Sequence, residues 1–411
     1  MATATQKIPS GYKQTEIGVI PADWDVKKLG DLGEIKMCRR IFNHETKDVG
    51  IIPFYKIGTF GKEADAYIPQ DLYDNYRHRF SFPKKGDVLI SAAGTIGRTI
   101  VYDGIPAYFQ DSNIVWINNN EELISNGYLY YVFQIVKYNT EGGTIQRLYN
   151  SIIKSTKFIC PTKPQQTAIV SILSDTDALI TKTEKLIQKK KNIKKGAMQE
   201  LLTGKLRLPG FSGLWVKLPL SKMINIPVSD GPHLTPRFLR NGIPFLSVNN
   251  LVGNKIDLTD LRYISKHDHE EFSKKCKPQK GDILLGKAAS VGLSAVVEFD
   301  FEFNIWSPIA LIRLNSDHNS KFVSYSLQTR AVINQIKLFT NSSSQGNIGM
   351  GDIEKIEFIV PPKDEQTAVA NVLSDMDTEI EKLESQLTKY QNIKQGMMQT
   401  LLTGKIRLLT K

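Results

Sequence analysis

An internal repeat constrains the fold of this chain more than any other feature of its sequence. Residues 166–208 align with residues 366–408 at a constant offset of 200 positions and without a gap. Of the 43 aligned positions, 24 are identical, and the two ends of the alignment match best. Chance does not align so many residues without gaps, so the repeat predicts one structural unit that occurs twice.

The segments before the two copies also correspond, although more weakly. The matching pairs are Trp24 with Trp215, residues 52–54 with 243–245, residues 85–90 with 280–285, and residues 158–161 with 358–361. The chain therefore has the order head, connector, head, connector. Because the connectors are alike and the heads differ, we expect the connectors to do one job twice and the heads to do two related jobs. The expected domains are residues 1–163, 164–208, 209–362 and 363–411.

Both connectors have the apolar periodicity of long helices. In the second connector apolar residues alternate at steps of three and four, the heptad pattern of a coiled coil. The first has a wider apolar stripe, which suits a helix packed on a partner. We expect single antiparallel helices over residues 166–202 and 366–402, each roughly 55 Å long. Two ordinary core helices are the simpler alternative, which the repeated pattern disfavours. The apolar positions of these helices that are expected to bind partners are Leu173, Ile180, Ile187, Leu201, Leu373, Ile380, Leu387 and Leu401.

Glycines mark particular places in the expected helices. Gly204 and Gly404 lie where a glycine commonly ends a helix. Gly196 and Gly396 lie inside, at a cost of about 1 kcal/mol each relative to alanine. These two glycines either allow two helices to approach closely or end the long helices early.

The heads are typical of mixed α+β domains. Short β-type runs alternate with turn residues rich in glycine, asparagine and aspartate. Strands are expected at residues 86–91, 99–102 and 113–117 in the first head and at residues 282–285, 294–299 and 308–314 in the second. Amphipathic helices are expected at residues 127–138 and 321–336.

The charge of the chain favours an anionic partner. The formal net charge is +11 and the isoelectric point is about 9.2, a balance that most often indicates nucleic acid. Arginine and lysine favour guanine edges and asparagine and glutamine favour adenine, although most such residues touch only phosphate. The candidate DNA-binding residues in loops are Lys36, Arg39, Arg40, Arg77, Arg79, Thr95, Arg98, His233, Thr235, Arg237, Asn249, Asn250, Lys287, Ser343 and Gln345.

Motifs of catalysis and metal binding are weak in this sequence. Residues 281–288 resemble a phosphate-binding loop but lack the hydroxyl residue after Lys287 that would hold magnesium. Residues 267–270 alternate histidine with acid, and we expect a charged surface turn there rather than a metal site. Three scattered cysteines argue against disulfides and a zinc site. With no signal peptide and no long apolar run, we expect a cytoplasmic protein.

The architecture resembles the specificity subunits of type I restriction–modification enzymes over essentially the whole chain. The marks of this resemblance are the connector ends at residues 199–205 and 399–405, the segment 18–24 followed by Leu29-Gly30, the Lys-Gly-Asp strand of each head, and the loop at residues 230–236. The first head lacks an obvious copy of that loop.

The resemblance implies a non-catalytic, DNA-reading subunit of a methyltransferase–endonuclease complex. Its fold would be α+β, with two mixed α/β target-recognition domains joined by two long antiparallel coiled-coil helices in a pseudo-twofold repeat. Each head would read one half of a bipartite DNA site, and the helices would set the spacer. Two methyltransferase subunits would dock on the helices, and motor–nuclease subunits would join them. S-adenosylmethionine, ATP and magnesium would be used by these partners, so the chain itself needs no cofactor.

Two other classes of function remain open from the sequence. The chain could be a modification enzyme whose chemistry does not show as a motif, which a methyl-transfer or cleavage assay of the purified chain would reveal. It could also be a coiled-coil scaffold that binds only protein, which a salt-dependent affinity for DNA would exclude.

Overall fold

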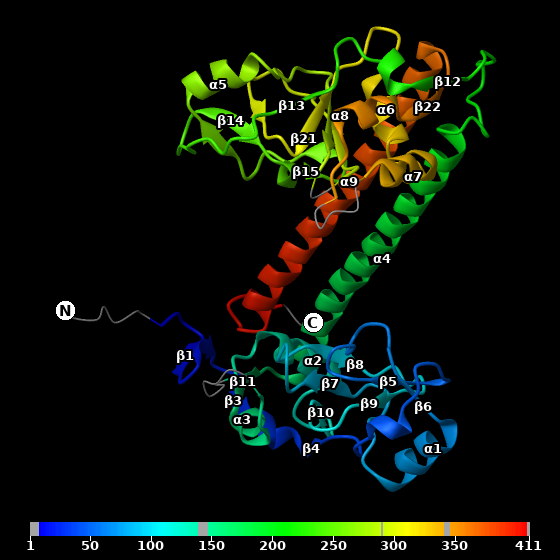
Figure 1. Ribbon diagram of the computed structural model, residues 1–411. Coiled ribbons are helices and arrows are strands. Elements are labelled where there is room, and N and C mark those ends of the chain that lie inside the picture. The colour runs from blue at the N-terminus through cyan, green and yellow to red at the C-terminus, as the bar shows by residue number, and fades with distance from the viewer. Residues whose placement is uncertain (1–7, 139–146, 289–290, 341–345, 409–411) are drawn as a thin grey trace. The chain divides into compact units, whose positions relative to one another are not determined.

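The chain forms two compact units, one built from two segments that lie far apart in the sequence and one built from a single continuous segment (Figure 1). The computed structural model describes residues 8–138, 147–288, 291–340 and 346–408. Unit 1 comprises Met1–Glu184 and Gln386–Lys411, and unit 2 comprises Lys185–Ser385. Each unit therefore holds one head, the first half of the long helix that follows this head, and the second half of the other long helix.

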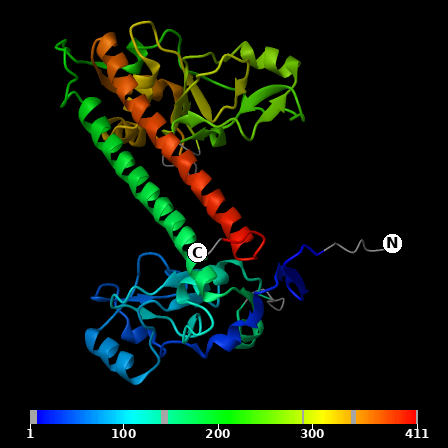
Figure 2. The same cartoon turned by 180° about the vertical axis from the view of Figure 1, so that it is seen from behind.

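Two continuous helices of 39 residues confirm the long helices predicted from the repeat. They are α4 (Lys163–Leu201) and α9 (Lys363–Leu401), and both can be followed in Figure 1 and Figure 2. Helix α4 begins earlier than expected because Pro164 fits the first turn, where a missing N–H group breaks no helical hydrogen bond. A Cβ atom added at Gly196 or Gly396 would meet no atom within 4 Å outside its own helix backbone. These glycines therefore neither end the helices nor allow a close helix contact.

In unit 1, a tyrosine, an aspartate and a lysine from three helices form one cluster. Tyr131 lies on α2 (Asn126–Ile135), Asp177 on α4 and Lys394 on α9. The Tyr131 hydroxyl donates to Asp177 Oδ2 at 2.8 Å, and Lys394 Nζ lies 2.7 Å from Asp177 Oδ1. Burial and the hydrogen bond to Asp177 raise the pKa of Tyr131 far above its usual value, so the phenol stays a neutral donor.

Unit 2 contains the same three residue types in the same arrangement. The hydroxyl of Tyr325, on α6 (Ser320–Ser326), donates to Asp377 Oδ2 at 2.7 Å. Lys194 Nζ lies 2.5 Å from Asp377 Oδ1 and 5.1 Å from the centroid of the Tyr325 ring. We call the two clusters the Tyr–Asp–Lys nodes. Each node joins the helix of a head to both long helices of its unit.

The contacts around the nodes establish that the long helices are antiparallel within each unit. In unit 1, Asp177 pairs with Lys394, and the Thr176 hydroxyl lies 3.9 Å from Met397 Sδ. Between these two contacts the residue number falls by one on α4 and rises by three on α9. In unit 2, Lys194 pairs with Asp377, and Lys190 pairs with Glu379 at 2.6 Å. Here too the residue number falls on α4 while it rises on α9. The antiparallel pairing predicted from the sequence is thus confirmed inside each unit.

The repeated Leu-Leu-Thr-Gly-Lys sequence ends each long helix with a glycine in the left-handed conformation. Gly204 and Gly404 both have a φ of +71°, which a residue with a side chain adopts at a cost. A Cβ atom on Gly404 would lie 3.0 Å from Trp24, and one on Gly204 would lie 3.3 Å from Trp215. Each tryptophan therefore packs on a helix end, which explains why both Trp and Gly recur in the two halves.

The glutamine that begins each repeat joins its long helix to the head in the same way. The Gln166 side chain accepts a hydrogen bond from the Ser125 backbone N–H at 3.0 Å and donates to the Pro161 carbonyl at 3.0 Å. Gln366 accepts from the Asn319 N–H at 2.9 Å and donates to the Pro361 carbonyl at 2.9 Å. Both amides are almost fully buried, so the identity of these residues reflects a structural bond made twice.

The two heads share one arrangement of strands. A four-stranded antiparallel sheet has the order β4-β10-β7-β8 in unit 1 and β13-β21-β18-β19 in unit 2. A three-stranded sheet has the order β6-β5-β9 in unit 1 and β17-β14-β20 in unit 2. The last strand of each head also pairs with an early strand of the same head, β11 with β3 and β22 with β12. The expected α+β fold with two mixed α/β heads and two long helices is confirmed.

The elements of each unit have the following bounds. The head of unit 1 contains β1 (Tyr12–Thr15), β2 (Gly18–Pro21), β3 (Asp25–Lys28), β4 (Ile35–Lys36), β5 (Ile52–Tyr55), β6 (Tyr67–Ile68), α1 (Gln70–Arg79), β7 (Val88–Ser91), β8 (Thr99–Val101), β9 (Tyr108–Phe109), β10 (Ile114–Ile117), α2, α3 (Asn150–Ser155) and β11 (Lys157–Cys160). The head of unit 2 contains β12 (Val216–Pro219), β13 (Ser229–Asp230), β14 (Ile243–Leu246), β15 (Leu251–Val252), β16 (Lys255–Ile256), β17 (Arg262–Ile264), α5 (Lys266–Ser273), β18 (Ile283–Gly286), β19 (Ser294–Val296), β20 (Asn304–Ile305), β21 (Ile309–Ile312), α6, α7 (Arg330–Phe339), α8 (Met350–Glu354) and β22 (Glu357–Val360).

The central strands are buried on both faces, which explains their unbroken apolar sequences. On β18, Ile283 and Leu285 join the core formed with the long helices, while Leu284 joins the core formed with the three-stranded sheet. On β7, Val88 and Ile90 face the helix side and Leu89 the other. The segment 281–288 is thus a core strand and not a phosphate-binding loop, as expected.

Two local predictions were wrong. The single helix expected at residues 321–336 is two helices, α6 and α7, because Thr329 is extended and its hydroxyl donates to the Ser326 carbonyl at 2.7 Å. The charged surface turn expected at residues 267–270 belongs to helix α5. This helix is capped by Ser265, whose hydroxyl oxygen accepts from the Asp268 N–H at 3.0 Å. His269 is buried there, with Nδ1 2.7 Å from Asn304 Oδ1.

The nodes predict a matched pair of stability effects. Asp177→Asn and Asp377→Asn each leave a lysine without its counter-charge in a largely buried site, and each should lower the free energy of unfolding by about 1–3 kcal/mol. Chemical denaturation measured by circular dichroism tests this. Asp175→Asn and Asp375→Asn, at exposed positions two residues earlier, are the controls. Equal losses in the node and control variants would contradict the assigned role.

Candidate nucleic-acid interface

Arginines predicted to bind DNA gather at the end of helix α1 in the first head. The guanidinium carbons of Arg39 and Arg79 lie 5.3 and 5.6 Å from the centroid of the Phe80 ring. Phe80 is 37% exposed and follows α1 directly. Within the described part of the chain neither arginine pairs with a carboxylate. Two cations held on one exposed aromatic ring without a counter-ion form a surface suited to anions.

Arg77 extends this surface. Its guanidinium carbon lies 5.9 Å from the ring centroids of both Tyr73 and Phe82. It also lines a groove of about 690 Å³ together with Lys84 and Lys85, and the lining contains one carboxylate, that of Asp103. We call Arg39, Arg77, Arg79 and Phe80 the arginine platform. Its chemistry fits the phosphate and sugar edge of a nucleic acid.

The other predicted residues of the first head have local partners or stand apart from the platform. Lys36 pairs with Glu34, its neighbour on the same segment. Arg40 Nε lies 2.9 Å from Asp111 Oδ2, and Arg98 donates to the Phe60 carbonyl at 2.9 Å. Thr95 is exposed, and its carbonyl accepts from the Ser91 hydroxyl. Arg40 and Arg98 therefore help to hold loops in place, with part of their charge offset.

In the second head, a buried carboxylate lies at the base of the proline-stiffened loop. The Asp230 side chain is 0% exposed, with Lys275 Nζ 2.5 Å from Oδ1 and Lys287 Nζ 2.9 Å from Oδ2. His233 Nε2 lies 3.4 Å from Oδ2. Burial by itself would raise the pKa of Asp230, but the hydrogen bonds and charges of the two lysines outweigh burial and lower it. Asp230 is therefore an ionised anchor for the start of the loop.

Tertiary contacts fix the loop backbone on both sides of its exposed residues. A Cβ atom on Gly231 would lie 1.7 Å from the Ile305 carbonyl oxygen, so only glycine fits there. The Pro232 carbonyl accepts from the Ser307 N–H at 3.2 Å. Phe238 packs against Phe245 and Trp306, with ring centroids 6.0 and 6.5 Å apart.

The residues between these fixed positions are available to a ligand. His233, Thr235 and Arg237 are all exposed. Pro232 and Pro236 restrict the backbone around them, so their directions are set at a low entropic cost. This segment of the second head has the properties of a rigid reading loop.

Two predicted residues of the second head have structural roles instead, and we remove them from the set proposed to read DNA. Asn250 is buried: its Oδ1 accepts from the Ser247 N–H, and its Nδ2 donates to the Asp257 and Asp260 carbonyls. Lys287 is buried against Asp230. Asn249 is exposed. Ser343 and Gln345 lie outside the described residues.

The sequence reading missed two aromatic contacts that organise the candidate surfaces. Arg262, on β17, has its guanidinium carbon 4.9 Å from the centroid of Phe238, next to Arg237. In the first head, Phe80 brings Arg39 and Arg79 together. An arginine beside an aromatic residue is visible in the sequence. The partner from another strand or loop is not, because tertiary contacts supply it.

The helix positions predicted to contact partners are mainly used inside the chain itself, which corrects that part of the prediction. Six of the eight are buried, and Ile180 and Leu387 are half-buried. Leu173 and Leu401 belong to the core of unit 1, and Leu201 and Leu373 belong to the core of unit 2. Ile187 and Ile380 are also buried. By contrast, Leu179, Ile193 and Ile393 are 43–47% exposed. A partner would therefore meet a different face of the helices.

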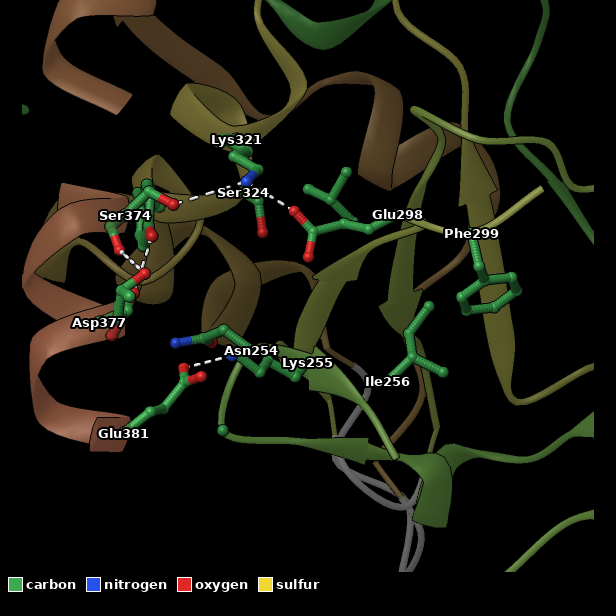
Figure 3. Close-up of a pocket in the computed structure, with 14 residues that line it drawn as sticks. Asn254, Lys255, Ile256, Glu298, Phe299, Lys321, Ser324, Ser374, Asp377 and Glu381 are labelled. Atoms are coloured by element: carbon green, nitrogen blue, oxygen red, sulfur yellow. Dashed lines mark hydrogen bonds and ion pairs between the residues drawn. The ribbon is translucent and has the colours of Figure 1, made fainter. Parts of the chain in front are cut away.

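A polar pocket in unit 2 lies where the second head is attached to helix α9 (Figure 3). It has a volume of about 280 Å³ and lies where the β15–β16 hairpin and α6 meet α9. Lys321 Nζ lies 2.5 Å from Glu298 Oε1 and 3.5 Å from the Ser374 hydroxyl, and Lys255 pairs with Glu381. Because these charges neutralise one another, we assign the pocket to the attachment of the head rather than to a ligand.

Among residues 8–138, 147–288, 291–340 and 346–408, no three or more His, Cys, Asp and Glu side chains are grouped to hold a metal ion. No helix in these ranges is long and apolar enough to span a membrane. Cys38, Cys160 and Cys276 are buried free thiols, as expected from their spacing.

Comparison with known proteins establishes the family. The family described as type I restriction modification DNA specificity domain matches residues 21–195 and again residues 236–390. The chain therefore belongs to this family and carries its specificity domain twice. The first match covers most of the first head and most of α4, and the second covers the second head from residue 236 onward and most of α9.

Curated relatives carry the same description. A putative type I restriction enzyme specificity subunit of Haemophilus influenzae is 55% identical over 155 residues, which is 38% of this chain and 40% of that protein. A putative type I restriction enzyme specificity subunit of Methanocaldococcus jannaschii, MjaX, is 27% identical over 430 residues, with 97% of both chains covered.

Solved structures show the same fold. The S subunit of a type I restriction–modification system from M. genitalium has a TM-score of 0.59 at 15% identity, over 92% of this chain and 96% of that chain. A chain from a study of type I complex assembly and conformational transition has a TM-score of 0.53 at 14% identity, over 94% of this chain and 99% of that chain.

The arginine platform predicts a salt-dependent contribution that is independent of sequence. With a net charge of +11, the affinity of the chain for duplex DNA should fall steeply as salt is raised, because bound phosphates release counterions. Arg79→Ala should weaken binding to all sequences alike and reduce the slope of log affinity against log salt by about one. Fluorescence anisotropy over a salt series measures both quantities. A slope unchanged by Arg79→Ala would contradict a phosphate contact.

The rigid loop predicts a sequence-dependent contribution. If Arg237 reads a base edge, Arg237→Ala should cost about 1–3 kcal/mol of binding energy and relax only one half of the site. Binding to duplexes altered in one or the other half-site measures this, with the exposed Arg240→Ala as the control. An equal loss of affinity for all sequences would make Arg237 a phosphate contact.

Proposed function

We propose that this chain is the DNA-reading subunit of a type I restriction–modification complex and that each head binds one half of a two-part site. One observation carries the proposal. The two units share sheet order, Tyr–Asp–Lys node and helix end, yet their heads present different exposed residues. A common frame with different surfaces is what recognition of two different half-sequences requires.

The two surfaces suit different parts of the recognition. In the first head, the arginine platform offers guanidinium groups to phosphates, which position the protein but carry no sequence information. In the second head, His233, Thr235 and Arg237 stand on a fixed loop, and a pre-set direction favours contacts with base edges in the major groove. Arg262, held on Phe238, lies next to this loop and would add to the same surface.

The chemistry of the complex is assigned to partner subunits. The charged groups that the structure brings together in the heads include arginines on aromatic rings and lysine–aspartate pairs, which are suited to binding and positioning. We propose that a methyltransferase partner uses S-adenosylmethionine and that a motor–nuclease partner uses ATP and magnesium. Assays of methyl transfer and cleavage with the chain alone and with its partners test this assignment.

The long helices are proposed to set the spacer between the half-sites and to dock two methyltransferase subunits. Both helices contribute one half to each unit, and the nodes fix the register of these halves. The number of helical residues between the two nodes would then determine the separation of the heads. The buried seam residues hold this frame, and the exposed helix faces remain for the partners.

Lengthening both helices by one heptad tests the proposal. Seven residues inserted after Lys185 and seven after Ser385 fall at the boundaries of the two units and leave each node and each head unchanged. Each insertion adds about 10 Å of helix, or roughly three base pairs at 3.4 Å per base pair. The same two half-sequences should be methylated across a longer spacer. Mapping of methylated sites, with the chain and its cognate methyltransferase expressed together, gives the result.

The outcome distinguishes the parts of the proposal. An unchanged spacer would show that the helices do not set the distance, and altered half-sequences would show that the heads do not read independently. Insertion of three residues instead is the control, since it breaks the heptad register and should prevent assembly. An unmodified genome in the presence of the unaltered chain and methyltransferase would overturn the DNA-reading role itself.

A further inference from the structure

The loop between β4 and β5 in the first head is the structural counterpart of the proline-stiffened loop between β13 and β14 in the second head. Both loops lead from an edge strand of the four-stranded sheet to the central strand of the three-stranded sheet. Strands β4 and β13 occupy the same place in their sheets, beside β10 and β21. The sequence does not show this correspondence, because the loops span residues 37–51 and 231–242 and share no motif.

Both loops begin against the equivalent segment of their heads. In the first head, the hydroxyl of Tyr108, on β9, donates to the Arg39 carbonyl at 3.0 Å. In the second head, the N–H of Ser307, in the turn after β20, donates to the Pro232 carbonyl at 3.2 Å. Strands β9 and β20 are themselves equivalent, since each pairs in parallel with the central strand of its sheet. The start of each loop is therefore held in the same place.

Both loops also end on equivalent residues. The Lys47 N–H donates to the Tyr67 carbonyl at 2.8 Å, and the Leu239 N–H donates to the Tyr263 carbonyl at 2.8 Å. Each of these tyrosines pairs with the proline of the Ile-Pro-Phe sequence that recurs in both heads. The two loops thus start and end at matching positions of one frame, although their sequences differ.

A short exposed segment lies between the fixed ends of each loop. In the first head it consists of Phe42, Asn43 and His44, and in the second head of residues 233–235. Each segment exposes a large apolar side chain, 51% of Phe42 and 77% of Leu234. We call residues 42–44 the Phe-Asn-His segment. It occupies the position in the first head that the exposed residues of the proline-stiffened loop occupy in the second.

Local contacts fix the Phe-Asn-His segment next to the arginine platform. Glu45 accepts a hydrogen bond from the Phe42 N–H at 2.7 Å with Oε2, and its Oε1 lies 3.4 Å from the Tyr76 hydroxyl. The Tyr76 ring in turn packs on the edge of Phe80, with centroids 5.4 Å apart. The His44 ring is nearly parallel to the ring of Phe42, at 5.8 Å between centroids. The segment is therefore ordered before any ligand binds.

We propose that the Phe-Asn-His segment reads the half-site of the first head and that Phe42 and Asn43 together recognise an A·T base pair in the major groove. His44 is a positioning residue that holds the ring of Phe42. The inference rests on the proposed function, because that function supplies a DNA ligand for each head. It adds reading residues to the first head, where the arginine platform supplies contacts to phosphate.

The chemistry of the two side chains selects the base pair. An asparagine amide matches the N6 and N7 groups of adenine, and an aromatic ring makes an apolar contact with the methyl group of thymine. An A·T pair presents both features in the major groove, whereas a G·C pair has no methyl group there. Neighbouring side chains such as Phe42 and Asn43 can therefore be satisfied by one pair.

The surroundings of the segment favour DNA over protein as its ligand. Within the described residues, Arg39 and Arg79 have no carboxylate partner, and both lie on Phe80, next to the segment. Phosphate contacts from these arginines would fix the register of the duplex and leave the base edges to the segment. A protein ligand would have to supply carboxylates for the same two arginines.

The experiment uses the full chain with its cognate methyltransferase subunit and maps the methylated sites. Asn43→Ala should relax one position of one half-site, and Arg237→Ala should relax the other half-site. Discrimination at that position should fall roughly 5- to 150-fold in binding measurements. Asn43→Asp keeps the shape of the side chain but accepts where the amide donates, so it should favour cytosine over adenine. This second variant gives a change of sequence and does not depend on any loss of stability.

A modified duplex tests the role of Phe42. Replacement of the thymine of the assigned pair by uracil removes only the methyl group and should weaken binding of the unaltered chain by about fourfold. The Phe42→Ala variant should bind the two duplexes equally, because it lacks the ring that contacts the methyl group. Equal binding of both duplexes by the unaltered chain would overturn the contact with thymine.

Asn120→Ala is the matched control. Strand β4 pairs Lys36 with Trp116 and Ile35 with Ile117, so the loop leaves the sheet at the end of β10 opposite to Asn120. Asn120 is exposed, and its replacement should leave both half-sequences unchanged.

The contrary outcomes are specific. Unchanged half-sequences in both Asn43 variants, an equal loss of affinity for all sequences, or relaxation of the half-site that Arg237→Ala relaxes would overturn the assignment. Loss of methyltransferase binding by Phe42→Ala, with the DNA affinity of the chain alone unchanged, would make the segment a protein contact and also overturn it. In each of these cases the unaltered complex still methylates a two-part site. Absence of any methylated site with the unaltered complex would instead overturn the proposed function.

Discussion

The ion pair between an aspartate of one long helix and a lysine of the other is the interaction on which the rest of this structure depends. Asp177 with Lys394, and Asp377 with Lys194, are between 12% and 29% exposed, so displacement of either partner leaves a charge in a site largely closed to water. An apolar seam alone tolerates a shift by a heptad, whereas this pair does not. Because the tyrosine of each node comes from the head, the same interaction fixes the head on the helices.

The two units have the same frame, although only one is built from a continuous segment. In unit 2, Trp215 packs on Gly204, which is 11 positions earlier in the chain. In unit 1, Trp24 packs on Gly404 through noncovalent contacts alone, and the Tyr12 hydroxyl donates to the Gly404 carbonyl at 3.0 Å. Each head therefore packs on the equivalent end of a long helix, the first head on the end of α9 and the second head on the end of α4. Such a frame supports two recognition surfaces that can differ without a change in the helices.

The buried charges divide into those that build the frame and those that build a surface. The nodes occur in both units and belong to the frame. The cluster of Asp230, Lys275 and Lys287 belongs to the second head, where it holds the loop that carries His233 and Arg237. In the first head Arg39 and Arg79 stack on Phe80 instead. The heads therefore reach a positively charged surface by two different means, a salt-bridged loop and an aromatic stack.

The sequence by itself determined the repeat, the two long helices and most core strands, because heptad spacing and apolar runs are local signals that burial enforces wherever the chain folds. It also indicated the loop beginning at Asp230, since glycine and proline restrict the backbone locally. Only the tertiary structure decided that Leu173 and Leu373 pack inside the chain. It also decided that Asn250 forms buried hydrogen bonds and Lys287 a buried ion pair. The contact of Arg39 and Arg79 with one aromatic ring is likewise tertiary. Each of these depends on which distant residue approaches, and a pattern of neighbouring residues along one chain carries no information about that.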